Sequence, residues 1–262
     1  MRFFMEEILE DERVIQELHK DSELLEKGKT IADYIMKHHD YPNIEAGMLP
    51  IYVLGYLADF VLERNLERGI SREITVQTLK DVNVWIENYE KQYGDIGLAE
   101  FHWLIFHYTS RLFRLGRLQF QLMVADAAIP TGDFVIETHI PQGDPLNIEQ
   151  CMLSFGMATK FFETYFPEYK ADYFMCHSWL LNPRISDVLN ESSNIVRFMS
   201  LWNKYDIPSD DSAQAIERVF GFGFKQEELA FAPENTTLQK ALKEYLLSGK
   251  ALDITAGYMR RW

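Results

Sequence analysis

Apolar residues recur at helical spacing through roughly the first 115 positions of the chain. The pattern predicts five helices, at residues 2–19, 22–38, 50–68, 71–86 and 98–115. Gly69 suits the end of the third helix, since glycine tolerates a left-handed conformation, and the Ser71 hydroxyl can cap the fourth. The short connections predict a bundle-like helical domain over residues 1–115.

After Gly116 the pattern changes to an alternation of polar and apolar side chains. Arg117–Val124 and Asp133–Ile140 alternate as half-buried strands do, and the segment Ala127–Gly132 between them predicts a hairpin turn. The elements expected next are a helix at 145–166, a strand at 172–181, a helix at 184–202, a strand at 205–207, helices near 211–220 and 236–248, and a strand at 253–260. Residues 116–262 should therefore form an α+β domain with a mixed sheet and flanking helices.

The composition narrows the classes of function. A net charge of −14 argues against a nucleic-acid binder or a partner on an anionic membrane, because both need a basic face. No apolar run approaches the ~18 residues that a membrane-spanning helix needs, and acids interrupt the N-terminus too early for a signal peptide. Cys151 and Cys176 lie in apolar stretches, as buried thiols of a reduced compartment do. A cytoplasmic protein is expected.

One strand carries candidate chemistry. Alternation places Glu137 and His139 on the same face of the strand 133–140. Burial would raise the pKa of Glu137 toward that of a general base working near neutrality, and His139 could share the task or relay a proton through water. The alternative is that both side chains line the solvated face of an edge strand.

The turn after this strand is a candidate anion site. Asp144 with Pro145 at the next position is a good helix start, and Asn147 is a competing cap. Free amides at the helix start could hold a pyrophosphate, but the Asp144 carboxylate would satisfy those amides and repel phosphate. Pure helix capping is the alternative.

The other polar clusters favour neither a metal site nor a hydrolase site. Arg111, Arg114 and Arg117 could meet a phosphate or carboxylate, or could complement a helix C-terminus and pair with nearby acids. The loop cluster of residues 38–40, His-His-Asp, has no second half at metal-ligand spacing. Ser178 lacks the Gly-x-Ser-x-Gly elbow of serine hydrolases.

Several segments carry a family resemblance. They are ETHIPQGDPL from residue 137, FPEY from 166, CHSWLLNP from 176, SSNIVRF from 192 and FHWLIFHYTSRLFRLGRLQFQ from 101. The chain resembles a bacterial acyltransferase family in which a helical N-acyltransferase N-terminal domain, here 1–115, precedes a GNAT-like C-terminal domain, here 116–262.

The resemblance implies how the donor, acyl-CoA, would bind without any permanent cofactor or metal. The end of the strand at Ile140 would take the pantetheine arm, and the turn Gln142, Gly143 and Asp144 would grip the pyrophosphate. The family's Gln/Arg-x-x-Gly-x-Gly/Ala signature is kept there only in loose form. The resemblance also implies that Asn194 and Tyr205 contact the thioester end.

The implied reaction is acyl transfer to an amine of a small molecule or peptide. Glu137, alone or with His139, would deprotonate the ammonium, and Tyr205 or Ser178 would donate a proton to the leaving thiolate. The alternative is a non-catalytic GNAT-like module that binds a small ligand or peptide. The sequence leaves the acyl length and the oligomeric state open.

Overall fold

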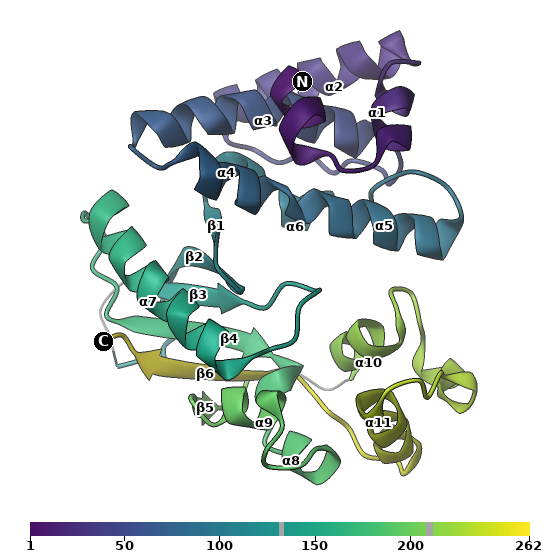
Figure 1. The fold of residues 1–262 in the computed structure, drawn as a ribbon, viewed down its shortest axis with the longest axis vertical. Coiled ribbons are helices and arrows are strands. Elements are labelled where there is room, and N and C mark those ends of the chain that lie inside the picture. The colour runs from purple at the N-terminus through teal and green to yellow at the C-terminus, as the bar shows by residue number, and fades with distance from the viewer. Residues whose placement is uncertain (131–133, 208–211) are drawn as a thin grey trace. The chain divides into compact units, whose positions relative to one another are not determined.

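The computed structural model describes residues 1–130, 134–207 and 212–262. Within these residues the chain divides into two compact units, Met1–Leu115 and Gly116–Trp262 (Figure 1). The first is helical and the second contains a mixed sheet with flanking helices, which confirms the predicted α+β class. Each unit is described on its own.

The first unit is built on a buried central helix. Helix α3 (Leu49–Glu67) is apolar nearly all round and forms the core with α2 (Ser22–His38), which packs along it. Around them lie the remaining elements: η1 (Phe4–Ile8), α1 (Glu12–Leu18), α4 (Arg72–Leu79), α5 (Asp81–Tyr93), α6 (Phe101–Leu104), η2 (His107–Thr109) and β1 (Leu112–Leu115). As predicted, Ser71 caps α4 by accepting the amide of Ile74.

Three predicted helices of this unit were wrong in extent. The first is broken at Leu9, whose extended backbone separates η1 from α1, and the fourth is divided between α4 and α5. The last predicted helix, 98–115, ends early. Ser110 adopts a left-handed conformation with φ of 57°, which stops the helical path, and the apolar run continues as strand β1 with buried Leu112 and Phe113.

The second unit contains the predicted hairpin. Strand β2 (Leu118–Val124) pairs antiparallel with β3 (Phe134–His139); Thr131, Gly132 and Asp133 of the predicted turn and strand lie outside the described residues. Strands β4 (Tyr173–Ser178), β5 (Asn203–Tyr205) and β6 (Thr255–Arg260) extend the sheet in the order β2-β3-β4-β6-β5. Of these pairings only β3 with β4 is parallel.

Helices cover one face of this sheet. Helix α7 (Ile148–Tyr165) lies across it (Figure 1), and Phe155 of α7 packs against Phe120 of β2 and Phe174 of β4. The predicted helix 184–202 is two short helices, α8 (Ile185–Val188) and α9 (Asn194–Met199). Together with η3 (Trp179–Leu181), η4 (Gln226–Phe231), α10 (Ala213–Phe220) and α11 (Thr237–Leu247), α8 and α9 form a second apolar cluster.

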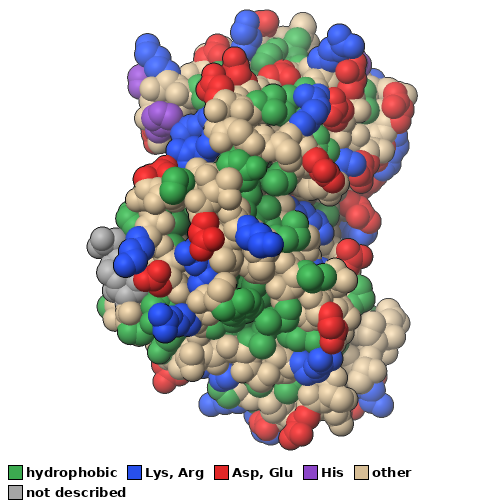
Figure 2. Space-filling model, turned by 60° about the vertical axis from the view of Figure 1, so that its left-hand side comes forward, with side chains coloured by type: hydrophobic (Ala, Val, Ile, Leu, Met, Phe, Trp, Pro, Cys, Tyr) green, Lys and Arg blue, Asp and Glu red, His purple; other side chains and the backbone are tan. Residues whose placement is uncertain are grey.

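Charged side chains of both signs are spread over the surface. On the face shown in Figure 2, basic side chains are interspersed with acidic and apolar ones rather than forming a continuous stripe. In the described part of the chain, no helix combines the length and the apolar character needed to cross a membrane.

Candidate active site

The sheet face opposite α7 carries polar side chains from several strands. Because side chains alternate along a strand, the paired register of β3 and β4 places Glu137, Met175 and His177 on one face. Tyr205 of β5 joins this face through the register of β6 with both strands. Polar groups from elements distant in sequence are thereby brought together.

His177 is the centre of this cluster. Its Nδ1 lies 3.0 Å from Oε1 of Glu137, and its Nε2 lies 3.0 Å from Oδ2 of Asp126, in the segment after β2. The hydroxyl of Tyr205 donates to the same Asp126 oxygen at 2.6 Å. His139 Nε2 lies 3.7 Å from Oε2 of Glu137. The imidazole of His177 is therefore held between two carboxylates, and a protonated ring can donate to both.

This arrangement fixes the charges of the cluster. The hydrogen bond to Glu137 raises the pKa of His177 above its ordinary value; burial opposes the rise, and Asp126 adds to it. Burial alone would raise the pKa of Glu137, but the hydrogen bond to His177 and the charges of both histidines outweigh it. The pKa of Glu137 is therefore lowered. The predicted upward shift was wrong, because the sequence did not reveal the histidine beside this carboxylate.

Asp126 and Tyr205, the other two groups bonded in the cluster, also have shifted pKa values. Burial raises the pKa of Asp126, but hydrogen bonds from Tyr205 and His177 reverse the shift and leave that pKa below its ordinary value. The pKa of Tyr205 is raised strongly by burial and by its bond to Asp126, so this phenol keeps its proton. Of the two carboxylates of the cluster Glu137 is the more enclosed, with 13% of its side chain exposed against 37% for Asp126. A molecule that approaches from solvent would meet Asp126 and His177 first.

Ser178 does not join the cluster. It follows His177 in β4, so its side chain points to the opposite face, where its hydroxyl accepts the amide of Leu180. Cys176 also points away, and burial raises the pKa of its thiol far above the ordinary value. The pKa of Cys151 is raised to about 11 by burial. Neither thiol has the character of a nucleophile.

The two parallel strands beside the cluster pair over only part of their length. The ladder between β3 and β4 joins Ile136 to Phe174 and Glu137 to Met175, and it does not include the C-terminal halves of either strand. At this point the Thr138 hydroxyl is buried without a hydrogen-bond partner among the described residues. The interrupted ladder and the buried hydroxyl leave hydrogen-bonding capacity in the middle of the sheet.

A hollow of about 530 Å³ lies at the N-terminus of α7. It is lined by Gly116, Arg117, Asp144, Pro145, Asn147, Gln150 and Asn194. Arg117 holds the preceding turn by donating to the carbonyl oxygens of Pro141 at 3.0 Å and Pro145 at 3.2 Å. Its guanidinium therefore places positive charge beside a helix N-terminus, an arrangement that favours anions.

The residues predicted to bind CoA surround this end of α7. Asp144 and Asn194 line the hollow, and Asn147, not Asp144, is the N-cap, since its side chain accepts the amide of Gln150. The helix therefore begins at Ile148 rather than at 145, and the exposed Asp144 carboxylate does not cap its amides.

The other predicted CoA-binding residues belong to the strand end and the turn. Ile140 directly follows β3, while Gln142 and Gly143 are exposed in the turn, with Gly143 at φ of 118°. The structure does not bring Asn194 and Tyr205 to one place: Asn194 begins α9 at the hollow, whereas Tyr205 binds Asp126.

Sequence reasoning missed His177 and Asp126 as members of the site. Strand alternation in the segment 172–181 already assigns His177 and Cys176 to opposite faces. Which of those faces carries Glu137 depends on the pairing of β3 with β4. Asp126 lies in a segment without periodicity, and no local signal identified it.

Family models account for nearly the whole chain. Residues 4–110 match the N-acyltransferase N-terminal domain, and residues 112–259 match the GNAT-like C-terminal domain. This chain belongs to the GNAT-like acyltransferase family. The predicted combination of an N-acyltransferase N-terminal domain with a GNAT-like C-terminal domain is thereby confirmed. No curated protein matches the sequence.

Solved structures of acyltransferases share the fold over the whole chain. One, in complex with decanoyl-CoA and teicoplanin, superposes with a TM-score of 0.84 at 24% identity and covers 100% of this chain and 87% of its own. Another, in complex with decanoyl-CoA, has a TM-score of 0.83 at 25% identity with the same coverage. A mutant with octanoyl-CoA also gives 0.84 at 24% identity and the same coverage. These similar structures share the fold that carries the cluster and the hollow.

Proposed function

We propose that this chain transfers an acyl group from acyl-CoA to an amine of a small molecule, with His177 as the proton acceptor. The observation that carries the proposal is the imidazole of His177 held between Glu137 and Asp126 beside the interrupted β3–β4 ladder. A fixed imidazole supported by a buried carboxylate is suited to general-base catalysis. Family membership and the acyl-CoA complexes of similar structures support the same reaction.

The donor is proposed to extend from the hollow at α7 to the cluster. Its pyrophosphate would lie at the start of α7 near Arg117, where a helix N-terminus and a guanidinium favour anions. The pantetheine arm would enter between the C-terminal halves of β3 and β4, where backbone groups and the Thr138 hydroxyl can bind its amides. The thioester would then reach the face that carries His177.

Glu149 and Arg197 would adjust to such a donor. Arg197 of α9 donates to the Glu149 carboxylate at 3.2 Å, and this carboxylate also accepts its own backbone amide at the start of α7. A pyrophosphate would compete with Glu149 for both groups. An exposed ion pair contributes little to stability, so this exchange costs little.

The proposed chemistry uses the polarity of the cluster. Asp126, ionised and the most exposed of the cluster carboxylates, would pair with the incoming ammonium of the acceptor. Transfer of one proton to Nε2 of His177 would free the nitrogen lone pair, which forms the new C–N bond at the thioester carbonyl. The C–S bond then breaks, the second proton of the attacking amine passes to the sulfur, and CoA leaves as the thiol. Glu137 would stabilise the imidazolium through Nδ1.

The acceptor is proposed to be a small molecule with a primary amine. One of the similar structures is a complex with decanoyl-CoA and teicoplanin, and another is a complex with CoA and 10C-Teicoplanin. Both complexes support a small-molecule acceptor for this chain. In this chain the exposed side of the cluster, at Asp126, is the side from which such a molecule would approach.

Product analysis tests the proposal directly. The full chain is incubated with octanoyl-CoA or decanoyl-CoA and a panel of primary amines, with thiol release and product mass as readouts. We expect one CoA thiol released per acylated amine, and a thermal shift on donor binding, since ligand at about 100 times its Kd adds about 2.7 kcal/mol. Donor binding without acylated product for any amine would instead favour a binding module, and absence of both would contradict the proposal.

A further inference from the structure

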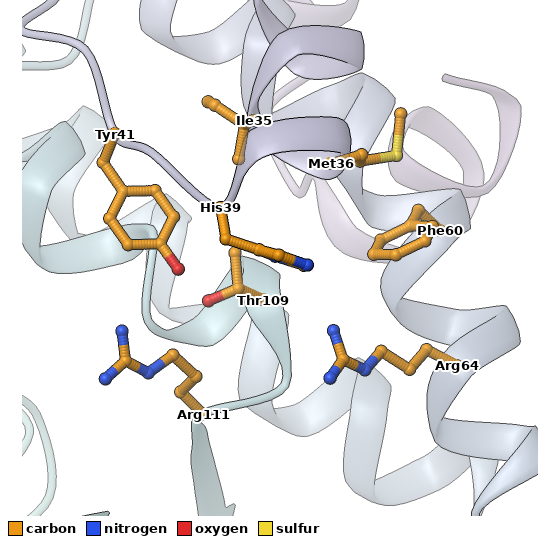
Figure 3. A pocket seen from close by; sticks show the side chains of 8 residues that line it. All are labelled: Ile35, Met36, His39, Tyr41, Phe60, Arg64, Thr109 and Arg111. Carbon is orange, nitrogen blue, oxygen red and sulfur yellow. The ribbon is translucent and has the colours of Figure 1, made fainter.

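The helical unit contains a cavity that the proposed acyl transfer does not use. It has a volume of about 320 Å³, at the small end of the range of ligand pockets of about 300–1,000 Å³. Figure 3 shows the side chains that line it: Ile35, Met36, His39, Tyr41, Phe60, Arg64, Thr109 and Arg111. They come from the end of α2 and the loop after it, from α3 and from the segment at η2.

Two arginines of this cavity lack acidic partners. Other arginines of the unit pair with carboxylates, such as Arg13 with Glu90 and Arg72 with Glu7. Among the described residues, neither Arg64 nor Arg111 forms an ion pair or a side-chain hydrogen bond, although Arg111 lies 5.3 Å from the centre of the Phe106 ring. In a chain of net charge −14, two guanidinium groups left without acids beside one cavity indicate an anion site.

Neutral polar groups complete the polar lining of the cavity. In Figure 3 the guanidinium groups of Arg64 and Arg111 lie on either side of Thr109, the Tyr41 hydroxyl lies on the Arg111 side, and the His39 ring extends toward Phe60. The Thr109 hydroxyl already donates its proton to the carbonyl of Ile105 at 2.7 Å, so the donors that face an anion are the Tyr41 hydroxyl and the two guanidinium groups. Hydroxyl and guanidinium donors of this kind bind carboxylate or phosphate oxygens.

Two residues with an uncommon left-handed backbone conformation lie at or next to the cavity. Within the described residues, His39 and Ser110 are the non-glycine residues with positive φ, at 53° and 57°. His39 lines the cavity, and Ser110 connects Thr109 to Arg111, which both line it. Side chains are rarely placed in this conformation, and such positions concentrate at functional sites. Both unusual positions of the described chain thus border one cavity.

One part of the cavity wall is apolar. Ile35 is buried, and Met36 and Phe60 are partly buried members of the helical core that face the cavity. An inorganic ion would leave this wall uncovered, whereas an apolar group attached to the anion would cover it. The cavity lining therefore combines charged and apolar side chains.

We propose that the helical unit binds a small amphipathic anion, a carboxylate or phosphate joined to an apolar group. Arg64 and Arg111 would hold the anionic group, and Phe60 with Met36 would contact the apolar part. This site lies within the first unit and is argued independently of the acyl-transfer chemistry.

Calorimetry with three probes tests the site in the full chain: inorganic phosphate, phenyl phosphate and phenylacetate. We expect saturable binding of phenyl phosphate or phenylacetate at low ionic strength, weakened by salt. Contact with the apolar wall should make phenyl phosphate bind about tenfold more tightly than inorganic phosphate. The ratio of phenyl phosphate to phenylacetate affinity tells which anionic group the arginines prefer. Equal binding of the two phosphates would overturn the apolar part of the assignment.

Matched variants test whether the probes bind in this cavity. Arg64→Gln and Arg111→Gln should each weaken phenyl phosphate at least ~10-fold, because each removes a charged donor. Arg72→Gln makes the same charge change outside the cavity and should leave the affinity unchanged. Exposed arginines without acid partners can be replaced without loss of fold, and circular dichroism checks this. If no probe saturates, or if the double variant binds like the parent, the site does not exist.

Discussion

A histidine held between two carboxylates titrates differently from one in solvent. In this chain Glu137 and Asp126 stabilise protonated His177, so the pKa of His177 is raised while the pKa values of both carboxylates are lowered. A general base must be neutral before it accepts a proton. The rate of acyl transfer should therefore rise with pH through the raised pKa of His177.

Removing one carboxylate should shift the rising limb of the pH–rate profile in a defined direction. Glu137→Gln removes the main stabiliser of protonated His177, so the pKa of His177 falls and the rising limb of kcat/KM shifts to lower pH. The maximal rate should also fall by about 100-fold, since the imidazole loses its orienting partner. Glu163→Gln, which removes an acid paired with Arg261, serves as the control and should change neither. A limb that stays in place or moves to higher pH would remove Glu137 from this role.

At the residue scale the sequence could predict only part of the cluster. Alternation along one strand was sufficient to place Glu137 and His139 on one face. His177 and Asp126 lie 40 and 79 residues from Glu137 and Tyr205, the residues they bond. Only the pairing of β3 with β4 and the path of the loop after β2 bring them together. For that reason the direction of the Glu137 pKa shift could not be predicted.

At the scale of the elements, the backbone at Gly116 approaches helix α7 closely, beside the hollow. Gly116 has φ of 74°, and a Cβ there would lie 2.8 Å from the Ser154 hydroxyl of α7. The same hydroxyl accepts the amide of Arg117 at 2.8 Å and donates to the carbonyl of Gln150 at 3.0 Å. This connection fixes the start of β2 against α7.

Gly116→Ala should therefore destabilise the chain by more than its backbone conformation alone requires. An alanine at positive φ costs about 1 kcal/mol, and the clash with Ser154 adds about 1–3 kcal/mol. Gly249→Ala is the matched control, since Gly249 has φ of 82° and a Cβ there would meet nothing within 4 Å. Urea denaturation should show the larger loss of unfolding free energy for Gly116→Ala. Equal losses would mean that the close contact with Ser154 does not add to the loss of unfolding free energy.

The sequence predicted most elements but not where they break. The helix 22–38 and the hairpin β2–β3 follow from periodicity and were confirmed. Divisions such as those at Ser110 and between α8 and α9 depend on tertiary contacts and on single backbone conformations. Apolar spacing continues across Ser110, so periodicity alone favoured one helix there.

On the scale of the whole molecule, the change of pattern near Gly116 was the strongest sequence signal. It separates helical from strand periodicity, and it predicted a helical part followed by a mixed sheet, as the structure has them. The family models match on either side of the same region. The position of the reactive cluster on one face of the sheet required the full topology.

The central claim is that His177 accepts the proton during acyl transfer. It is tested most directly by kcat/KM for decanoyl-CoA and an amine acceptor in His177→Gln, beside His102→Gln, which changes a histidine of the other unit bonded to Asn43. We predict a loss of at least ~100-fold for His177→Gln with unchanged affinity for decanoyl-CoA, and parental activity for His102→Gln. Parental activity in His177→Gln would contradict the account.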